Sequence, residues 1–471
     1  MNRLDRFFEI SARGSTVATE VRGGLVTFIA MAYIIVLNPI ILSGIEDVTG
    51  HKLEFEQVSA VTSLAAGVMT ILFGVVSRLP FAFAAGLGLN TFVATTLVGS
   101  LTWPEAMGLV VINGLIIVTL AATGLRRLVF DAVPIQLKTA ITAGIGLFIL
   151  FIGLVDAGFV GSTGMASPPV GLGIGGIGDI STVPTVVFVF TLLLTGVLVV
   201  RRVRGGILIG LIAGTLVAIV VEAIWHIGSV ADKPGGWSLS VPTLSGSPFA
   251  LPDLSLVGDF SLHGSVGRIG VLAVIMFVFT LVFANFFDAM GTFTGLAREA
   301  GLADDQGTFP RLRSALIVEG AGAVAGGATS ASSNTVFIES GAGIEDGART
   351  GLANLVTGTL FLAAMFISPL ASIVPTEVAA AALVIVGAMM VSQLRHIEIS
   401  EFSVALPVVL TVAVMPFSYS IANGIGVGFI AWVVMRSAAG KAREISPLLW
   451  VVAAGFLVYF ARGWIESLIG G

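Results

Sequence analysis

The chain has 471 residues, of which 56% are hydrophobic and 11% are charged, with a formal net charge of −5 at pH 7. Because about a quarter of the residues in a soluble domain are charged, this composition excludes a soluble globular protein. The lack of cysteine excludes disulfides, iron–sulfur clusters and thiolate metal sites, and the four histidines lie in polar connecting segments, so we expect no metal centre and no cofactor.

The apolar residues form runs of about 17–23 residues, the length a helix needs to cross about 30 Å of hydrocarbon. The N-terminal segment has no apolar run before Gly23, so it is not a signal peptide and the first run is already a span. The stretch 447–460 is either a fifteenth span or a helix lying against the membrane. Hydropathy predicts fourteen spans, at 23–42, 58–76, 80–99, 104–124, 134–156, 183–200, 205–225, 267–292, 312–329, 331–347, 351–370, 377–392, 401–416 and 419–437.

Lys and Arg predict the orientation, because they concentrate in cytoplasmic loops. With the N-terminus inside, the outer loops hold only Lys52, Lys233 and Arg268, while Lys138 lies near the inner end of a span and Arg462 lies in the tail. The other 18 of the 23 basic residues fall in cytoplasmic segments: Arg3, Arg6, Arg13, Arg22, Arg78, Arg126, Arg127, Arg201, Arg202, Arg204, Arg298, Arg311, Arg313, Arg349, Arg395, Arg436, Lys441 and Arg443. We expect a multi-pass protein of the cell inner membrane with a cytoplasmic N-terminus.

The two halves of the chain resemble each other. The pair Val133-Pro134 recurs 241 residues later at 374–375, and the pair Asn90-Thr91 recurs 244 residues later at 334–335. Each half would hold seven spans, and because seven is odd the second half enters the membrane from the opposite side. Inverted repeats are typical of transporters, with the substrate site at the repeat interface near the midplane.

The third and tenth predicted spans differ from lipid-facing helices. The third has Pro80 at its entrance and Gly86 and Gly88 in its middle, and the tenth places a polar cluster, residues 329–335, at the depth of the bilayer. Irregular backbone is tolerated at that depth only inside protein or along a cavity. These two segments therefore point to a binding site, although single small residues also suit close helix packing.

Three acids lie well inside predicted spans: Asp288 in NFFDAMGTFTG, Glu319 in LIVEGAGAVAGG and Glu339 in FIESGAG. A charge at mid-bilayer costs about 2.5–3.5 kcal/mol, so acids that persist there usually face a cavity and serve function. No basic residue lies at comparable depth, which favours proton exchange by these groups, while Glu319 suits a structural hydrogen bond equally well. Three further acids near span ends are expected to be solvated: Glu105, Asp156 and Glu222.

Four segments around these residues resemble the nucleobase–cation symporter-2 family, in the AzgA-like branch that carries hypoxanthine, guanine and adenine: TFIAMAYIIVLNPIIL, AGLGLNTF, FFDAMGTFTGLAREAGL and FIESGAGIEDGARTGLANLVTG. The similarity extends from about Leu4 to Lys441. It implies a secondary active transporter, a homodimer in the lipid membrane, that takes up purine nucleobases with protons in an elevator-like alternating-access cycle.

The resemblance also implies an all-α membrane fold of fourteen spans in a 7+7 inverted repeat, with short antiparallel strands in spans 3 and 10 that meet at the site. A core domain would comprise spans 1–4 and 8–11, and a gate domain spans 5–7 and 12–14. The implied segments are a cytoplasmic N-terminus at 1–22, core halves at 23–124 and 267–370, gate halves at 134–225 and 377–437, an extracellular or periplasmic loop at 226–266, and a C-terminal segment with an extra apolar helix at 438–471.

Residue by residue, the branch's purine-binding positions correspond to Asn90, Asp288 and Glu339, and its acidic position in span 9 to Glu319. The chain departs from the branch pattern at Ala85, Asn285, Ala289, Met290, Asn334 and Val336, so the preferred base stays open. We expect substrate contacts from Asn90, Asp288, Glu339, Thr292, Ser332, Thr335 and Gly86, and proton coupling by Asp288, Glu339 and Glu319.

Other functions are less compatible with the sequence. An enzyme would need a nucleophile–base pair or a metal cluster, and a channel would be expected to have charged rings or repeated carbonyl filters. The open alternative is another cargo on the same fold, such as xanthine, uracil or a small anion. An anion carrier would place Lys or Arg near the breaks, where none occurs, and nothing indicates a nucleic-acid partner.

Overall fold

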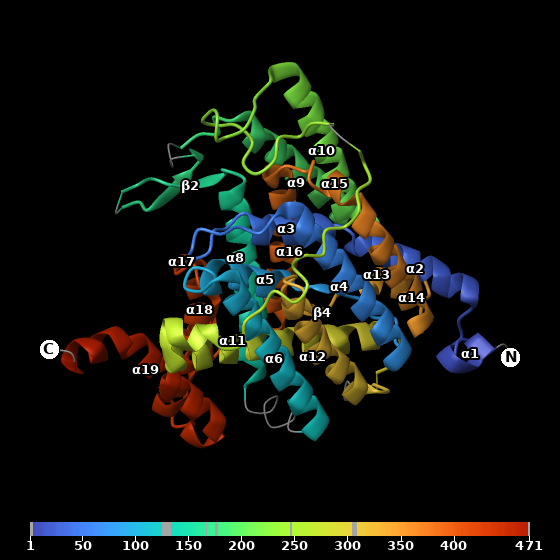
Figure 1. Ribbon diagram of the computed structural model, residues 1–471. Helices are drawn as coiled ribbons and strands as arrows, with labels where there is room; N and C mark the ends of the chain where they lie inside the picture. Colours follow the sequence, from blue (N-terminus) through green and yellow to red (C-terminus); the bar gives the residue numbers. More distant parts are fainter. Residues whose placement is uncertain are drawn as a thin grey trace.

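The computed structural model describes residues 3–124, 133–165, 167–174, 178–244, 247–303 and 309–469. Arg126 and Arg127, expected on the cytoplasmic side, lie outside these residues. The main helices are α1 (Arg3–Phe8), α2 (Val17–Met31), α3 (Ile34–Ser43), α4 (Phe55–Val76), α5 (Leu87–Phe92), α6 (Trp103–Thr123), α8 (Ile135–Asp156), α9 (Val183–Val200), α10 (Gly206–Trp225), α11 (Gly264–Glu299), α12 (Leu312–Ala328), α13 (Ser340–Glu345), α14 (Gly351–Ala364), α15 (Ser368–Ala371), α16 (Thr376–Val391), α17 (Phe402–Phe417), α18 (Ile421–Ala438) and α19 (Pro447–Ile469) (Figure 1). The strands are β1 (Phe83–Ala85), β2 (Val160–Ser162), β3 (Val170–Leu172) and β4 (Asn334–Val336).

Ten helices in the described residues are long and apolar enough to cross a membrane. Each of the fourteen predicted spans coincides with a helix or with a strand and helix in succession, and four spans fall short as single helices for visible reasons. Spans 3 and 10 contain β1 and β4, while α12 has 17 residues and α17 has 16. The all-helical membrane architecture with short strands in spans 3 and 10 is confirmed.

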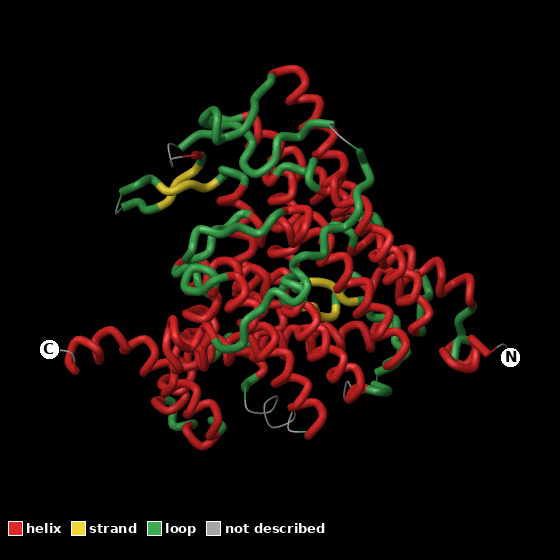
Figure 2. The backbone as a smooth tube through the Cα atoms, in the orientation of Figure 1, coloured by secondary structure: helices red, strands yellow, loops and turns green. Residues whose placement is uncertain are grey.

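The two broken spans meet inside the molecule. β1 pairs antiparallel with β4, with Ala84 opposite Thr335, and Figure 2 shows this pair enclosed by helices, while the β2–β3 hairpin projects from one end. After β1 the chain enters α5 and then a π-helical stretch at Val93–Leu97, and after β4 it enters the six-residue α13. Each broken span is therefore a short strand followed by a short helix.

The helices pack in pairs, three of which join helices that are distant in the sequence. α4 packs on α14, α6 on α12 and α8 on α16, while α9 and α10 pack together, as do α17 and α18. Glycines permit this close approach, since a Cβ on Gly114 or Gly320 would lie 2.5–2.6 Å from backbone nitrogen of the facing helix. The tight α6–α12 contact brings Glu319 of α12 close to β4.

Two helices differ in extent from their predicted spans. α11 continues well past the predicted 267–292 and bends at Gly270, whose φ of 81° favours glycine. The 447–460 stretch forms most of α19, which packs on α18 and α11 and extends away from the helical body (Figure 1).

Candidate functional site

Side chains from neighbouring helices satisfy the extended backbone of β1. Thr70 accepts a hydrogen bond from the Phe83 amide at 2.9 Å and donates one to its carbonyl at 3.1 Å. The Ser340 hydroxyl accepts from the Ala82 amide at 2.9 Å, and the Asn354 amide donates to the Phe81 carbonyl at 2.7 Å. Because buried backbone groups need such partners, these residues permit a strand within a helical membrane fold.

Tight packing fixes the turn that leads into β4. Ser330 and Ser332 have φ of 55° and 64°, in the left-handed region that non-glycine residues seldom adopt. A Cβ on Gly326 of α12 would lie only 1.8 Å from the Ser332 carbonyl oxygen, and one on Gly86 would lie 2.7 Å from the Thr335 methyl. Strained backbone held by close packing is often found at functional sites.

Asn90 lies fully buried on α5 in a network of amides. Its side chain donates to Asn38 of α3 at 2.5 Å, and Asn38 donates in turn to Thr62 at 2.7 Å and to the Ala331 carbonyl at 3.1 Å. The network joins both broken spans, because Ala331 precedes β4. The Oδ1 atom of Asn90 has no hydrogen-bond partner among the described residues.

Glu339 and Asp288 lie close enough for their charges to repel each other. Glu339 is the residue before α13, and its carboxyl group accepts a hydrogen bond from the hydroxyl of Tyr33, which is fully buried between α2 and α3. Asp288 is half-buried on α11 and has no hydrogen bond or ion pair within the part of the chain that the structure describes. Thr292 follows one helical turn later, so it shares the face of α11 that carries Asp288.

Glu319 is fully buried on α12, behind β4. Its Oε2 accepts a hydrogen bond from the Val336 amide at 3.2 Å, and the charge of Asp288 acts on it. The Oε1 atom lacks a hydrogen-bond partner among the described residues. Glu319 therefore holds the backbone of β4 by a hydrogen bond, which is one of the two roles expected for it from the sequence. It also belongs to the group of acids that includes Asp288 and Glu339.

Buried polar atoms without hydrogen-bond partners are concentrated around the two strands. Buried polar groups are normally paired, so a cluster of unpaired ones marks a place where water or a ligand completes the bonding. Within the described residues these atoms include Glu319 Oε1, Asn90 Oδ1, Asn285 Oδ1, Ser332 Oγ, Thr335 Oγ1, and Nδ2 and Oδ1 of Asn334. Asn285 also donates to Ser333 at 3.1 Å, which ties α11 to the turn before β4.

The structure thus brings the candidate residues together at one place: Asn90 and Gly86 on the first broken span, Ser332, Thr335 and Glu339 on the second, Asp288 on α11 and Glu319 on α12. Sequence reasoning missed two members of this site, Tyr33 and Asn38. The LNP triplet at 37–39 was a usable signal, since an Asn beside Pro within an apolar span is rarely lipid-facing.

The expectation that Glu105 is solvated was wrong. Its side chain is 10% exposed and accepts from Arg268 at 2.7 Å, while it also accepts from the Thr102 amide at the start of α6. Arg268 lies on the first turn of α11, before the bend at Gly270. The ion pair therefore fastens this end of α11 to α6, a contact that hydropathy alone cannot reveal.

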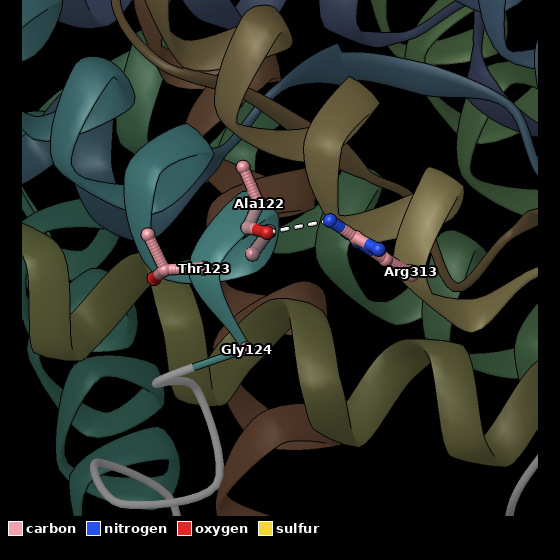
Figure 3. Close-up of a pocket in the computed structure, with 5 residues that line it drawn as sticks. Ala122, Thr123, Gly124 and Arg313 are labelled. Atoms are coloured by element: carbon pink, nitrogen blue, oxygen red, sulfur yellow. Dashed lines mark hydrogen bonds between the residues drawn. The ribbon is translucent and has the colours of Figure 1, made fainter.

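Two surface pockets lie away from the strands. In one, at the C-terminal end of α6, Arg313 of α12 donates to the Ala122 carbonyl at 2.6 Å (Figure 3). The other, of about 480 Å³, lies between the starts of α8 and α17 and the end of α18 and is lined by Gln136, Glu401 and Arg436 among others. Neither contains a residue predicted to bind substrate.

Comparison with known proteins gives the family. Residues 18–427 match the model of the Permease family, Xan_ur_permease. The guanine/hypoxanthine permease PbuG of Bacillus subtilis is 38% identical, with 97% of this chain and 99% of that protein covered, and the adenine permease AdeP of Escherichia coli is 35% identical, with 97% and 95% covered. The transmembrane domain of the cyanobacterial bicarbonate transporter BicA has the same fold, with a TM-score of 0.60 at 17% identity over 90% of this chain and 97% of that one. The chain belongs to the Xan_ur_permease family, which is the nucleobase–cation symporter-2 family that its motifs resemble.

Proposed function

We propose that the chain is a proton-coupled importer of purine nucleobases whose substrate site lies between the two broken spans. The observation that carries this proposal is the cluster of buried, unpaired polar atoms around β1 and β4, next to Asp288 and Glu339. A purine has donors and acceptors along its edges and a flat apolar face, so it can satisfy such atoms within an apolar surrounding. PbuG and AdeP are named as carriers of guanine, hypoxanthine and adenine, which supports this class of cargo.

The site also argues against a small anion as cargo. Asp288 interacts electrostatically with both Glu339 and Glu319, and none of these three acids forms an ion pair with a Lys or Arg of the described residues. An anion would be repelled by any of these groups in the charged form. A neutral base avoids this cost and can accept or donate hydrogen bonds at each carboxyl group.

Proton coupling fits the same three carboxyl groups. No cysteine exists in the chain, and the part that the structure describes holds no group of three His, Asp or Glu able to bind a metal ion. Among the described residues Asp288 has no partner to hold its charge, so loading a proton there removes a charge from the moving part at a gain of about 2.5–3.5 kcal/mol on insertion scales. We assign the coupling role to Asp288, with Glu339 and Glu319 able to share the proton.

The helix packing supports an inverted repeat that divides into the predicted core and gate domains. Exchanging each span with the one seven places away converts the α4–α14 pair into α12–α6, and the α9–α10 pair into α17–α18, and all four pairs occur. Spans 1–4 and 8–11 pack mainly among themselves, as do spans 5–7 and 12–14, with α11 and α5 contacting α8 between the two groups. Such a division suits an elevator-like movement of one group against the other.

Uptake by purified protein in proteoliposomes tests the proposal. Labelled hypoxanthine should accumulate under an inward proton gradient and stop accumulating with a protonophore, and unlabelled guanine, adenine, xanthine and uracil should rank the preferred base by competition. Asp288→Asn should bind purine but lose accumulation, whereas Asp232→Asn, in an exposed outer loop, should behave as the unmodified protein. Uptake that requires sodium and ignores the proton gradient would contradict the coupling assignment.

A further inference from the structure

One cluster of charged residues outside the site has more positive than negative side chains. Glu9, just after α1, accepts hydrogen bonds from Arg13 at 2.8 Å, Arg311 at 2.9 Å and Arg78 at 3.4 Å. One carboxylate therefore faces three guanidinium groups, and we call these four residues the Glu9 cluster. Asp5 of α1 forms no ion pair with these arginines among the described residues, and its two oxygens accept hydrogen bonds from Ser11.

The three arginines differ in exposure and in how many of their N–H donors already form hydrogen bonds. Arg13 is nearly buried, with 10% of its side chain exposed, and it also donates to the carbonyls of Arg78 and Arg349. Arg78 and Arg311 are 28% and 30% exposed, and in the described residues Glu9 is the only acid that either contacts. Each guanidinium carries five N–H donors, so both keep donors that a further anion can use.

An exposed apolar surface leads directly to these donors. On α4 the residues Val68, Leu72, Val75 and Val76 are 39–46% exposed and fall at spacings of four and seven or eight, which places them on one face. Arg78 follows two residues after this face ends. On the other side of Arg78 lies α1, at the edge of the molecule (Figure 1), where the ring of Phe7 packs 4.3 Å from the guanidinium carbon.

We propose that this surface binds an anionic phospholipid, with the phosphate at Arg78 and Arg311 and an acyl chain along the exposed face of α4. A phospholipid is the occupant favoured over a free anion because the basic cluster and the apolar face are continuous, and a membrane supplies both chemistries in that order. The exposed side chains of Leu4 and Phe7 on α1 fit the level of the lipid head groups, where amphipathic helices lie. Bound lipid would tie α1, the end of α4 and the start of α12 together.

Reconstitution in nanodiscs of phosphatidylcholine, with and without phosphatidylglycerol, tests this site. Phosphatidylglycerol should raise the melting temperature, and native mass spectrometry should detect retained phosphatidylglycerol. In Arg78→Gln/Arg311→Gln the affinity for this lipid should fall about tenfold or more, the size expected for lost charge-assisted hydrogen bonds. Arg202→Gln is the control, because Arg202 has the same left-handed backbone as Arg78 and Arg311 but is exposed and lies outside the cluster.

Each of the following results would overturn the proposal: no effect of phosphatidylglycerol, an equal effect in the glutamine double variant, or the same stabilisation by inorganic phosphate in phosphatidylcholine nanodiscs, which would assign the cluster to free anions. The double variant Arg78→Lys/Arg311→Lys tests whether a loss of lipid affinity in the glutamine double variant is caused by misfolding. It retains the charge but loses the paired donors, so it should keep part of the lipid affinity if the site is real, and retention of none in a folded protein would contradict the proposal.

Discussion

The carboxyl group of Glu339 has a protein partner and can still accept hydrogen bonds from a ligand. Tyr33 donates its hydroxyl hydrogen to one oxygen, and an ionised carboxylate has further lone pairs on both oxygens. Guanine offers two donors on one edge, N1–H and the 2-amino group, whereas hypoxanthine offers N1–H alone. Adenine offers an acceptor at N1 beside its 6-amino donor, which suits a carboxyl group only when it is protonated.

Glu339→Gln should therefore weaken guanine binding and change the order of preference. The amide replaces one acceptor by an N–H group that faces the donors of guanine, so the loss of a charge-assisted hydrogen bond, about 1.5–3 kcal/mol, lowers the affinity about tenfold to a hundredfold. Adenine should lose much less, because the amide can donate to N1 and accept from the 6-amino group. Direct binding to purified protein measures both constants.

Glu345→Gln is the control for this substitution, since Glu345 is exposed at the far end of the same short helix α13. It should leave both affinities unchanged. Equal guanine affinity in Glu339→Gln and the unmodified protein would remove Glu339 from contact with the base.

At the scale of elements, the sequence predicts the breaks but not the contacts that stabilise them. Two irregular segments are predicted from Pro80, the glycines and the polar cluster at 329–335, because lipid-facing helices do not carry such residues. The partners of the strand backbone come from distant helices: Thr70 of α4 and Asn354 of α14. Apolar periodicity shows only that these helices are buried, so the residues that complete the strands need the tertiary structure.

Gly326→Ala tests the packing of α12 on the turn before β4. The added methyl would meet the Ser332 carbonyl at 1.8 Å and the Asn334 amide at 2.8 Å, and both are backbone atoms that must shift. We expect a loss of about 1–3 kcal/mol of stability or more, with weaker purine binding because the unpaired groups move. Thermal unfolding and direct binding measure the two effects.

Gly291→Ala provides the comparison within a helix. Gly291 lies on α11 near the same site, but no atom lies within 4 Å of its added Cβ. Because alanine is favoured over glycine by about 1 kcal/mol in helices, this variant should be as stable as the unmodified protein or more stable. Equal melting temperatures for the two alanine variants would show that the α12 contact is not tight.

The docking of α1 should depend on pH through Glu9. Partial burial acts to raise the pKa of this carboxyl group, but the hydrogen bond from Arg13 and the charges of Arg13, Arg311 and Arg78 hold the pKa below its usual 4.5. A lowered pKa means that the stabilisation is present above 4.5 and is lost as the pH falls through the value in the folded protein. After correction for the intrinsic exchange rate at each pH, the hydrogen-exchange protection of residues 3–13 should therefore fall in acid, and Glu9→Gln should show low protection already at neutral pH. Low protection at every pH in the unmodified protein would contradict docking by this cluster.

For the whole molecule, one ion pair among the described residues joins the two proposed domains, and the proposed movement of one domain against the other would break it. Asp346 follows α13 and is 5% exposed, and it accepts hydrogen bonds from Arg22 of α2 and from Arg204, in the turn between α9 and α10. Asp346 belongs to the proposed core and Arg204 to the proposed gate, while Arg22 is the last residue of the proposed N-terminal segment. α13 thus carries Glu339 at one end and an inter-domain ion pair at the other.

Arg204→Gln should shift the population of the two domains away from the arrangement seen here. Arg22 still neutralises Asp346 in this variant, so the protein should fold, and only the link to the gate is lost. Because Arg204 is 54% exposed, its contribution is that of a partly solvated pair, up to about 1 kcal/mol or about fivefold in population.

The chain has no cysteine, so spin labels can be attached at Val76→Cys and Val200→Cys, one exposed position on each proposed domain, without removing native cysteines. Distance distributions between the labels should broaden or move in Arg204→Gln and stay unchanged in Arg202→Gln, whose side chain is two residues away and makes no ion pair among the described residues. Identical distributions in all three proteins would mean that this ion pair does not hold the gate against the core.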